Sequence, residues 1–402
     1  MTNPFQRRPN QDGRHTPNLW PVWLVAPGAL LLVALAAYGL YHGAELLLAD
    51  ESTGQGKKPV PVQDVIKTTV TVLTLAGAVL AALYAYRKQL LDEGTSHRAD
   101  ATQLTERYTK AAEQLGHEQA AVRLAGVYAM ARLADDWPEQ RKVCVDVLCA
   151  YLRMPYTTVT TASGFRHGER EVRLTIIRII RSHLQNPFGA TTWCEYSLDF
   201  TGATFDGCDF NGSYFRGDLV DFSDALFIGG KVNFRGVTFS GRHVDFSDAR
   251  FSARHVDFGD ARFSASHVDF TAAKFSESEV VFSTAKFSAS QVSFIGASFS
   301  EGLVYFNSAR FEGGGVGFIG ARFSASQVYF RSARFEGGGV GFRGAVFSDG
   351  LVSFTDAVFS AGSIDFGDMT FSDCPVSFEN AAVEGAATIG WGSFPPIPGN
   401  HP

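Results

Sequence analysis

The 402-residue sequence has few methionines (4), no paired cysteine motif and no recognisable catalytic motif. Its five cysteines form no Cys-x-x-Cys pair and are odd in number, which argues against a disulfide scaffold or a zinc finger and favours a reducing compartment. It contains no Gly-x-Ser-x-Gly motif, no phosphate-binding glycine loop and no His-Glu-x-x-His motif. We therefore expect no enzyme activity and no cofactor.

The composition is that of a folded chain with one strongly biased segment. Hydrophobic residues make up 45% and charged residues 19%, which is too apolar for a disordered chain, and the net charge is −6. The length leaves room for more than one domain. Phenylalanine occurs 35 times, and 31 of these lie between Phe200 and Phe378, so the bias belongs to that segment alone.

Two uncharged apolar runs occupy the N-terminal quarter, 22 residues at 20–41 and 19 residues at 68–86. About 20 apolar helical residues cross a bilayer, and the first run exceeds the apolar stretch of a signal peptide. We predict two transmembrane helices, with residues 1–19 a disordered tail and residues 42–67 a loop. The lipid bilayer is thus an expected partner.

Positive charge predicts the orientation of these spans. The two flanks hold six lysines and arginines against three in the intervening loop, which favours both termini and the rest of the chain in the cytoplasm. We therefore expect a multi-pass protein of the cell membrane. The runs contain no acidic or basic residue, so they suggest no ion path.

Residues 87–195 have the pattern of a small all-α connector. Apolar residues recur every three or four positions in four segments, and the second and third are separated at Trp137–Pro138. Paired helices around a proline turn resemble a HEAT-type unit. The segments are 104–116, 122–136, 140–153 and 171–184. The last helix carries several arginines, which we interpret as a solvated face rather than a nucleic-acid site. They are Arg170, Arg173, Arg178 and Arg181.

From Leu198 the sequence becomes periodic. Phenylalanine recurs every five residues up to Phe215, and thereafter at alternating intervals of seven and five. The resulting unit is twelve residues long, as in VDFSDARFSARH followed by VDFGDARFSASH. Such a short, sustained period indicates a solenoid in which each coil buries its apolar side chains against the next.

The segments LDFTG, ATFDG and CDFNG (198–212) resemble the pentapeptide-repeat family, whose unit centres on Leu or Phe with a small residue two places earlier. The resemblance continues to about residue 383 as paired pentapeptides separated by two extra residues. It implies an all-β right-handed quadrilateral β-helix with four pentapeptides per coil. We place this domain at 196–383 and expect residues 384–402 to form a C-terminal cap or tail.

Two coil lengths are compatible with a twelve-residue unit. Twelve residues per coil would give a flat, two-sided solenoid, and twenty-four would give a four-sided one. Residues 304–323 recur almost unchanged at 328–347, displaced by 24. We favour the twenty-four-residue coil, because repeated units stack like upon like.

The core of the predicted coil consists of the repeated phenylalanines, with valine or alanine two places before each. Alternating large and small residues can interleave across the axis as close packing requires. The structural core residues that we select are Phe200, Phe205, Phe246, Phe251, Phe270, Phe294 and Phe318.

Histidines and aspartates recur at one corner, where a twenty-four-residue coil stacks His243 on His267, with Asp245 and Asp269 beside them. Imidazole and carboxylate groups are zinc ligands. Only two histidines stack, however, and no cysteine joins them, so we expect no metal.

The residues immediately before the phenylalanines supply the candidate partner-binding surface: Tyr305, Tyr329, Arg310, Arg322 and Arg334. We expect them to bind an unknown protein, and we expect the whole chain to be a membrane-anchored, non-enzymatic cytoplasmic interaction scaffold. The sequence does not indicate the oligomeric state.

Two alternatives remain. Some pentapeptide-repeat proteins protect DNA gyrase by mimicking DNA with an acidic rod, and residues 196–402 hold 23 acidic and 14 basic residues. Rows of arginine and lysine on two sides oppose that function, and nucleic-acid binding is not expected. The second alternative is a membrane sensor or transport accessory.

Overall fold

The computed structural model describes residues 62–264, 267–288 and 291–394, together with seven positions between 28 and 42. The chain divides into two compact units, residues 1–102 and residues 103–402.

The predicted membrane-spanning helices are contradicted. No helix among the described residues is both long enough and apolar enough to cross a membrane. The run 68–86 lies inside α2 (Val62–Gly116), a 55-residue helix, and the charged segment after Tyr86 continues it without a break. The same run contains four threonines. One of them, Thr71, donates its hydroxyl hydrogen back to the carbonyl of Lys67 at 2.8 Å.

Most of the first predicted span, 20–41, and of the predicted loop, 42–67, lies outside the described residues, as does the predicted tail 1–19. The expected location in the cell membrane with cytoplasmic termini depended on both spans. That prediction is therefore wrong as well.

The second unit begins with helices. The last turns of α2 pack against a short helical array whose elements are α3 (Ala120–Asp136), η2 (Pro138–Gln140), α4 (Arg141–Arg153) and α5 (Glu169–Leu184). Pro138 sits at the first position of η2, where its missing N–H has no helical partner to lose. These helices occupy the segments in which the sequence showed apolar residues every three or four positions.

A buried charge network ties these helices together. Glu169 of α5 lies 3.2 Å from the Nε of Arg123 of α3 and accepts a hydrogen bond from the hydroxyl of Tyr151 of α4 at 3.1 Å. Burial, with the charge of Glu169, raises the pKa of Tyr151 to about 12. Arg173 is only 3% exposed, so its interpretation as part of a solvated face is wrong.

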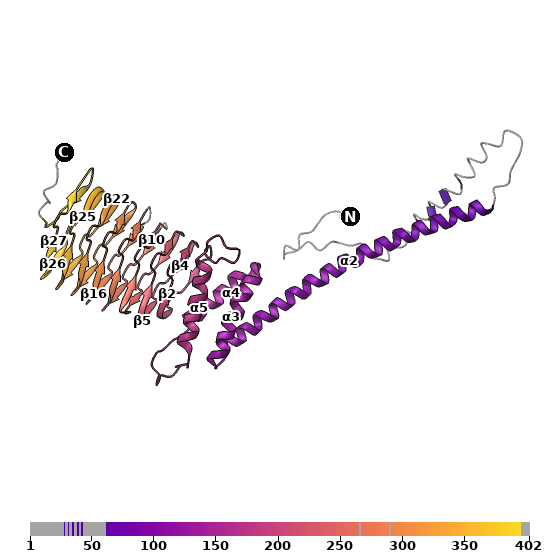
Figure 1. The fold of residues 1–402 in the computed structure, drawn as a ribbon, viewed down its shortest axis with the longest axis horizontal. Coiled ribbons are helices and arrows are strands. Elements are labelled where there is room, and N and C mark those ends of the chain that lie inside the picture. Colours follow the sequence, from indigo (N-terminus) through magenta and orange to yellow (C-terminus); the bar gives the residue numbers. More distant parts are fainter. Residues whose placement is uncertain are drawn as a thin grey trace, which may run out of the picture. The chain divides into compact units, whose positions relative to one another are not determined.

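The remainder of the unit is a right-handed β-solenoid with four faces, drawn in Figure 1 as stacked strands from β1 to β29. Successive turns of the chain visit the faces in one order, which we name the aspartate, mixed, tyrosine and basic faces.

The aspartate face contains β1 (Leu198–Asp199), β4 (Leu219–Asp221), β7 (His243–Asp245), β11 (His267–Asp269), β15 (Gln291–Ser293), β19 (Gly315–Gly317), the ends of β22 (Arg334–Gly341) and β25 (Val358–Asp365), and β29 (Thr388–Gly390). The mixed face contains the starts of β2 (Thr204–Asp209) and β5 (Leu226–Asn233), then β8 (Arg250–Phe251), β12 (Lys274–Ser276), β16 (Ser298–Ser300), β20 (Arg322–Ser324), β23 (Val346–Ser348) and β26 (Thr370–Ser372).

The tyrosine face contains the ends of β2 and β5, then β9 (His255–Asp257), β13 (Glu279–Val281), β17 (Leu303–Tyr305), β21 (Gln327–Tyr329), β24 (Leu351–Ser353) and β27 (Val376–Ser377). The basic face contains β3 (Tyr214–Phe215), β6 (Thr238–Phe239), β10 (Arg262–Phe263), β14 (Lys286–Phe287), β18 (Arg310–Phe311), the starts of β22 and β25, and β28 (Ala382–Val383).

The strand register confirms the twenty-four-residue coil. Parallel neighbours pair residues 24 apart, such as Phe263 with Phe287 and Val268 with Val292. The first coil is shorter, because Leu198 pairs with Val220, and the resulting difference appears as a register shift between β2 and β5. The flat twelve-residue coil is excluded, since no described strand pairs with its copy twelve residues away.

The interior is a set of phenylalanine stacks. The ring of Phe294 lies parallel to that of Phe270 at 4.8 Å and to that of Phe318 at 4.9 Å. Neighbouring stacks meet edge to face, as between Phe294 and Phe306 at 90°. Both geometries suit the quadrupole of the ring. Each of the following side chains has an exposed fraction of 0%: Phe200, Phe205, Phe246, Phe251, Phe270, Phe294 and Phe318.

The corners require an unusual backbone. The second residue after a phenylalanine of the aspartate or tyrosine face adopts a positive φ, for example Asp248 at 55° and Gly320 at 63°. The aspartate before that phenylalanine caps the same turn, because Asp245 Oδ1 accepts a hydrogen bond from the N–H of Ser247 at 2.7 Å. Many acidic groups of the solenoid therefore serve the turns.

The helical array covers the first coil, as Figure 1 shows beside β2 and β4. Three ion pairs join the two parts: Arg153 with Asp199 at 2.9 Å, Arg170 with Asp206 at 3.0 Å, and Arg181 with Asp209 at 2.8 Å. At the other end, the ring of Trp391 lies 5.8 Å from that of Phe378 and 6.1 Å from that of Phe366.

Replacement of Phe294 by alanine is predicted to lower the free energy of unfolding by about 3–5 kcal/mol, because it removes a fully buried ring from the middle of a stack. Urea unfolding followed by circular dichroism measures this. The control Ser298→Ala, on the outside of β16, should cost at most about 0.5 kcal/mol. Equal losses in the two variants would contradict the stacked interior.

Substitution of two glycines in one coil distinguishes the cost of a left-handed backbone conformation from the cost of fitting a side chain into the available space. Gly320 has a φ of +63°, Gly317 has no positive φ, and a Cβ at either position meets no close neighbour. Gly320→Val should therefore destabilise the fold by about 1–2 kcal/mol, the usual cost of a left-handed side-chain-bearing residue. Gly317→Val should have no destabilising effect, and equal losses in thermal unfolding would exclude this account of the corner.

Candidate partner-binding surface of the solenoid

Tyr305 and Tyr329 form an aromatic ladder on the tyrosine face. They are register partners on β17 and β21, and their rings stack at 5.4 Å with an angle of 15°. The hydroxyl of Tyr329 donates a hydrogen bond to the side-chain oxygen of Gln327 at 2.6 Å. Partial burial, helped by the charge of Glu279, raises the pKa of Tyr305. The ladder thus presents two half-exposed rings held in one orientation.

The three arginines of the predicted surface do not lie together. Arg310 and Arg334 are register partners on the basic face. Arg322 belongs to β20 of the mixed face, where its register partners are Ser298 and Val346. The basic and mixed faces are opposite sides of the coil, because the chain visits the tyrosine face between them. One partner surface therefore cannot include all three arginines side by side.

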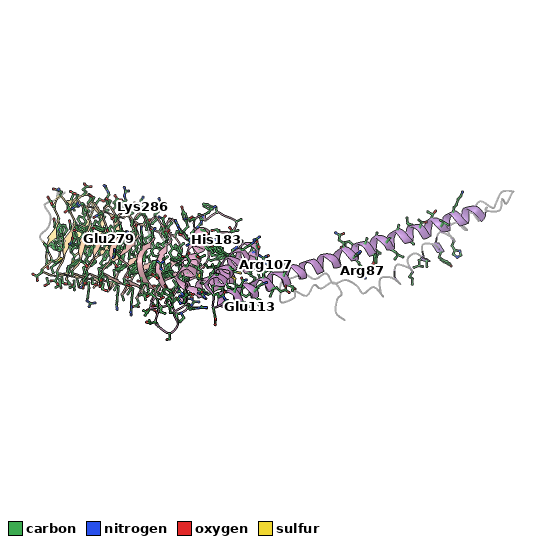
Figure 2. All side chains as sticks on the ribbon, turned by 60° about the horizontal axis from the view of Figure 1, so that its bottom comes forward. Arg87, Arg107, Glu113, His183, Glu279 and Lys286 are labelled. Atoms are coloured by element: carbon green, nitrogen blue, oxygen red, sulfur yellow. The ribbon has the colours of Figure 1, made fainter. Side chains whose placement is uncertain are left out.

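The basic face extends the ladder of Arg310 and Arg334 by two further cations. Arg262 pairs in register with Lys286, and Lys286 pairs with Arg310. Figure 2 labels Lys286 on this face and Glu279 on the tyrosine face. Neither Arg262 nor Lys286 belongs to the partner-binding surface predicted from the sequence. Successive cations of this ladder are 24 residues apart, so the coil length predicted from the sequence would have been enough to group all four.

The repeated histidines stack on one another and lie beside the aspartates that hold the turns. The rings of His243 and His267 stack at 5.0 Å, and the Nε2 of His243 lies 3.6 Å from the carboxylate of Asp245. The same carboxylate is held by the turn N–H of Ser247. Among the described residues, no group of three or more His, Cys, Asp or Glu side chains is arranged to hold a metal ion.

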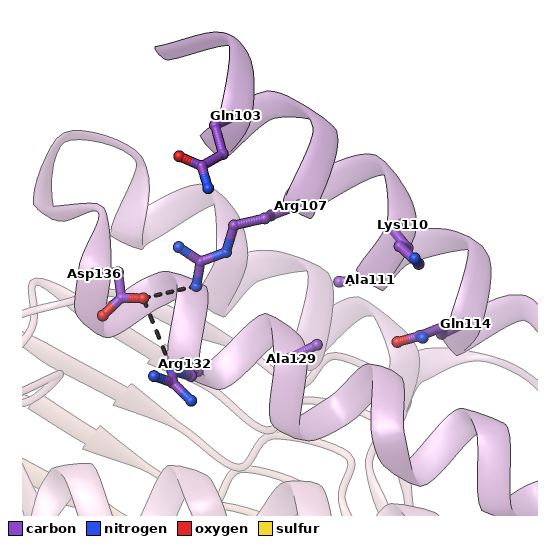
Figure 3. A pocket seen from close by; sticks show the side chains of 8 residues that line it. All are labelled: Gln103, Arg107, Lys110, Ala111, Gln114, Ala129, Arg132 and Asp136. Atoms are coloured by element: carbon purple, nitrogen blue, oxygen red, sulfur yellow. Dashed lines mark hydrogen bonds and ion pairs between the residues drawn. The ribbon is translucent and has the colours of Figure 1, made fainter. Parts of the chain in front are cut away.

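A separate hollow of about 470 Å³ lies between the end of α2 and α3. Figure 3 shows Arg107 and Arg132 converging on Asp136, at 2.6 Å and 4.0 Å. Lys110 and Gln114 line the other side. The pair of Arg107 with Asp136 joins α2 to α3, whereas Arg132 and Asp136 both belong to α3. The sequence does not indicate this hollow, because it depends on how two helices pack.

The cysteines offer no activated nucleophile. Burial raises the pKa of Cys144 to about 11 and that of Cys149 to about 12. Burial also raises the pKa of the remaining three, which are Cys194, Cys208 and Cys374. A thiol acts as a nucleophile only as the thiolate, so none of these groups is poised for chemistry at neutral pH.

No protein-family model matches the chain, and no curated protein matches it. Among solved structures, the chain is similar to one described as a trypsin-treated variant of QnrB1, a plasmid-mediated fluoroquinolone resistance protein. The identity is 21% over 47% of this chain and 87% of that chain, with a TM-score of 0.16. A likeness at this level supports no conclusion about function.

Thiol reactivity tests this description. With a disulfide reagent at pH 8, we expect at most one fast-reacting thiol in the native protein, that of Cys374, since the other four cysteines are buried. All five should react in denaturant. The Cys374→Ser variant should show no fast phase, and reaction of three or more thiols in the native protein would contradict the packing.

Proposed function

We propose that this chain is a non-enzymatic protein-interaction scaffold of the pentapeptide-repeat type. The observation that carries the proposal is the ladder of Tyr305 and Tyr329, two stacked and partly exposed tyrosines on an otherwise regular face. Tyrosine is enriched in protein–protein interfaces, since its ring supplies contact area with few rotamers to order. The solenoid places the two rings in a fixed register, so little conformational entropy is lost on binding.

Two leucines lie on the same face as the tyrosine ladder. Leu303 precedes Tyr305 by two residues, and Leu351 occupies the equivalent position two coils further on, both half-buried. Gln327 lies in register between the two leucines, so the patch combines apolar and polar side chains, as protein interfaces do. The surface therefore suits a polypeptide partner.

The mimicry of DNA is not favoured, because the most acidic part of the solenoid is already engaged. Residues 199–224 contain six acids and one base. Three of those acids, Asp199, Asp206 and Asp209, are paired with arginines of the helical array. Others cap turns, as Asp221 does for Ser223. The alternative of a membrane sensor or transport accessory required the two spans and is not retained.

Photo-crosslinking in the cell of origin tests the proposal. A benzophenone amino acid in place of Tyr305 or Tyr329 of the full-length chain should yield a discrete adduct with one polypeptide. The control positions are Ile295 and Ile319, which are more exposed than the partly buried tyrosines, also 24 residues apart, and directly follow phenylalanines of the aspartate face. They should yield no such adduct.

The double variant Tyr305→Ser and Tyr329→Ser copies Ser353 of the next coil and should abolish capture of the polypeptide identified by crosslinking. The matched control Ile295→Thr and Ile319→Thr copies Thr271 and should leave capture unchanged. If both variants retain the partner, the tyrosine ladder is not the binding surface.

A further inference from the structure

The four cations of the basic face stand at one position of consecutive coils. Arg262, Lys286, Arg310 and Arg334 are joined pairwise by the registers of β10, β14, β18 and β22. Neighbouring parallel strands lie about 4.8 Å apart, so the four backbone positions form a straight row about 14 Å long. The mixed face, on the opposite side, has no such continuous row, because Ser298 stands in register between Lys274 and Arg322.

The row is only partly neutralised. Among the described residues, Arg262 and Lys286 have no acidic group within ion-pair distance. Arg310 lies 3.8 Å from Glu312 and Arg334 lies 2.6 Å from Glu336, yet both arginine side chains remain 48% exposed. Aligned like charges with few counterions favour an anionic ligand that spans several coils.

Hydroxyl groups lie beside the cations. A hollow of about 480 Å³ is lined by Lys286, Arg310 and Arg334 on one side and by the corner residues Ser308 and Ser332 on the other. The acid at its end, Asp260, is engaged by Arg235 at 2.6 Å and by the hydroxyl of Thr284. A carboxylate entering the hollow would therefore meet cationic and hydroxyl donors together, which is a favourable combination.

We propose that the basic face binds an acidic α-helix that lies along the solenoid axis with one carboxylate per helical turn. The proposal rests on the proposed scaffold function and names a partner chemistry for a second face. A helix repeats its side chains about every 5.4 Å, so over three intervals it departs from the row by only about 2 Å. Flexible arginine and lysine side chains cover that difference.

Other anionic ligands fit less well. An extended acidic strand presents side chains on one side about every 6.8 Å and departs from the row by about 6 Å over the same three intervals. Nucleic acid carries a dense charge, whereas residues 196–402 have a net charge of −9, from 14 basic and 23 acidic residues.

The test uses the full-length chain and three fluorescent probes at low salt. The first is an alanine-based helical peptide with glutamate on one face at every turn. The second has the same number of glutamates, with glycine and proline inserted to keep it extended, and the third is a DNA duplex. We expect the helical peptide to bind at least about tenfold more tightly than the other two, with an affinity that falls as salt is added.

Matched charge variants locate the site. The triple variant Lys286→Gln, Arg310→Gln and Arg334→Gln should weaken binding of the helical peptide at least about tenfold. A control with the same charge change on the mixed face, Arg250→Gln with Lys274→Gln and Arg322→Gln, should stay within about twofold of the parent.

Equal weakening by both triple variants would overturn the proposal, because binding would then follow net charge alone. If the extended peptide binds more tightly than the helical peptide, the proposed helical geometry is wrong. If DNA binds more tightly than the helical peptide, the proposed class of ligand is wrong. If none of the three probes binds while crosslinking at Tyr305 is preserved, the proposal of an acidic helical ligand is wrong. The proposed scaffold function would not be affected by that result.

Discussion

The stacking of each phenylalanine ring on the ring twenty-four residues away is the constraint on which the solenoid depends. It fixes the register of all four faces at once, because a strand that slipped by one residue would turn its phenylalanine outward. Phe294 shows the outcome, lying between Phe270 and Phe318 at nearly equal distances. Once the interior is in register, outward-facing residues 24 positions apart lie next to each other on adjacent coils. Where such residues are identical or similar, they form a ladder along the face.

The corners divide the surface into groups with different roles. Asp245 and its equivalents cap turns, and the acids of the first coil pair with Arg153, Arg170 and Arg181. Much of the acidity that makes the chain look like a DNA mimic therefore serves the fold. The two proposed partner surfaces, the tyrosine ladder and the row of cations, lie on faces that adjoin.

The sequence predicted the solenoid well, because its interior is determined by local repetition. The copy of 304–323 at 328–347 was sufficient for the coil length. Prediction from the sequence was wrong where the burial of a side chain depends on contacts between segments far apart in the chain. Arg173 was interpreted as exposed, yet the junction of α4, α5 and β2 buries it. The predicted partner-binding residues include both Arg310 and Arg322, which lie twelve residues apart and therefore on opposite faces. Apolar run length alone also gave the wrong interpretation of the segment that α2 contains.

A distance along one face tests the central claim most directly. Spin labels replacing Thr238 and Arg334, in a Cys374→Ser background, mark residues joined by four successive register steps of the basic face. Their backbones should be about 19 Å apart, four times the strand spacing, and pulsed electron paramagnetic resonance should give a single narrow distance distribution near that value. A distance near about 38 Å, as twelve-residue coils would require, or a broad distribution would contradict the four-sided solenoid and the ladders built on it.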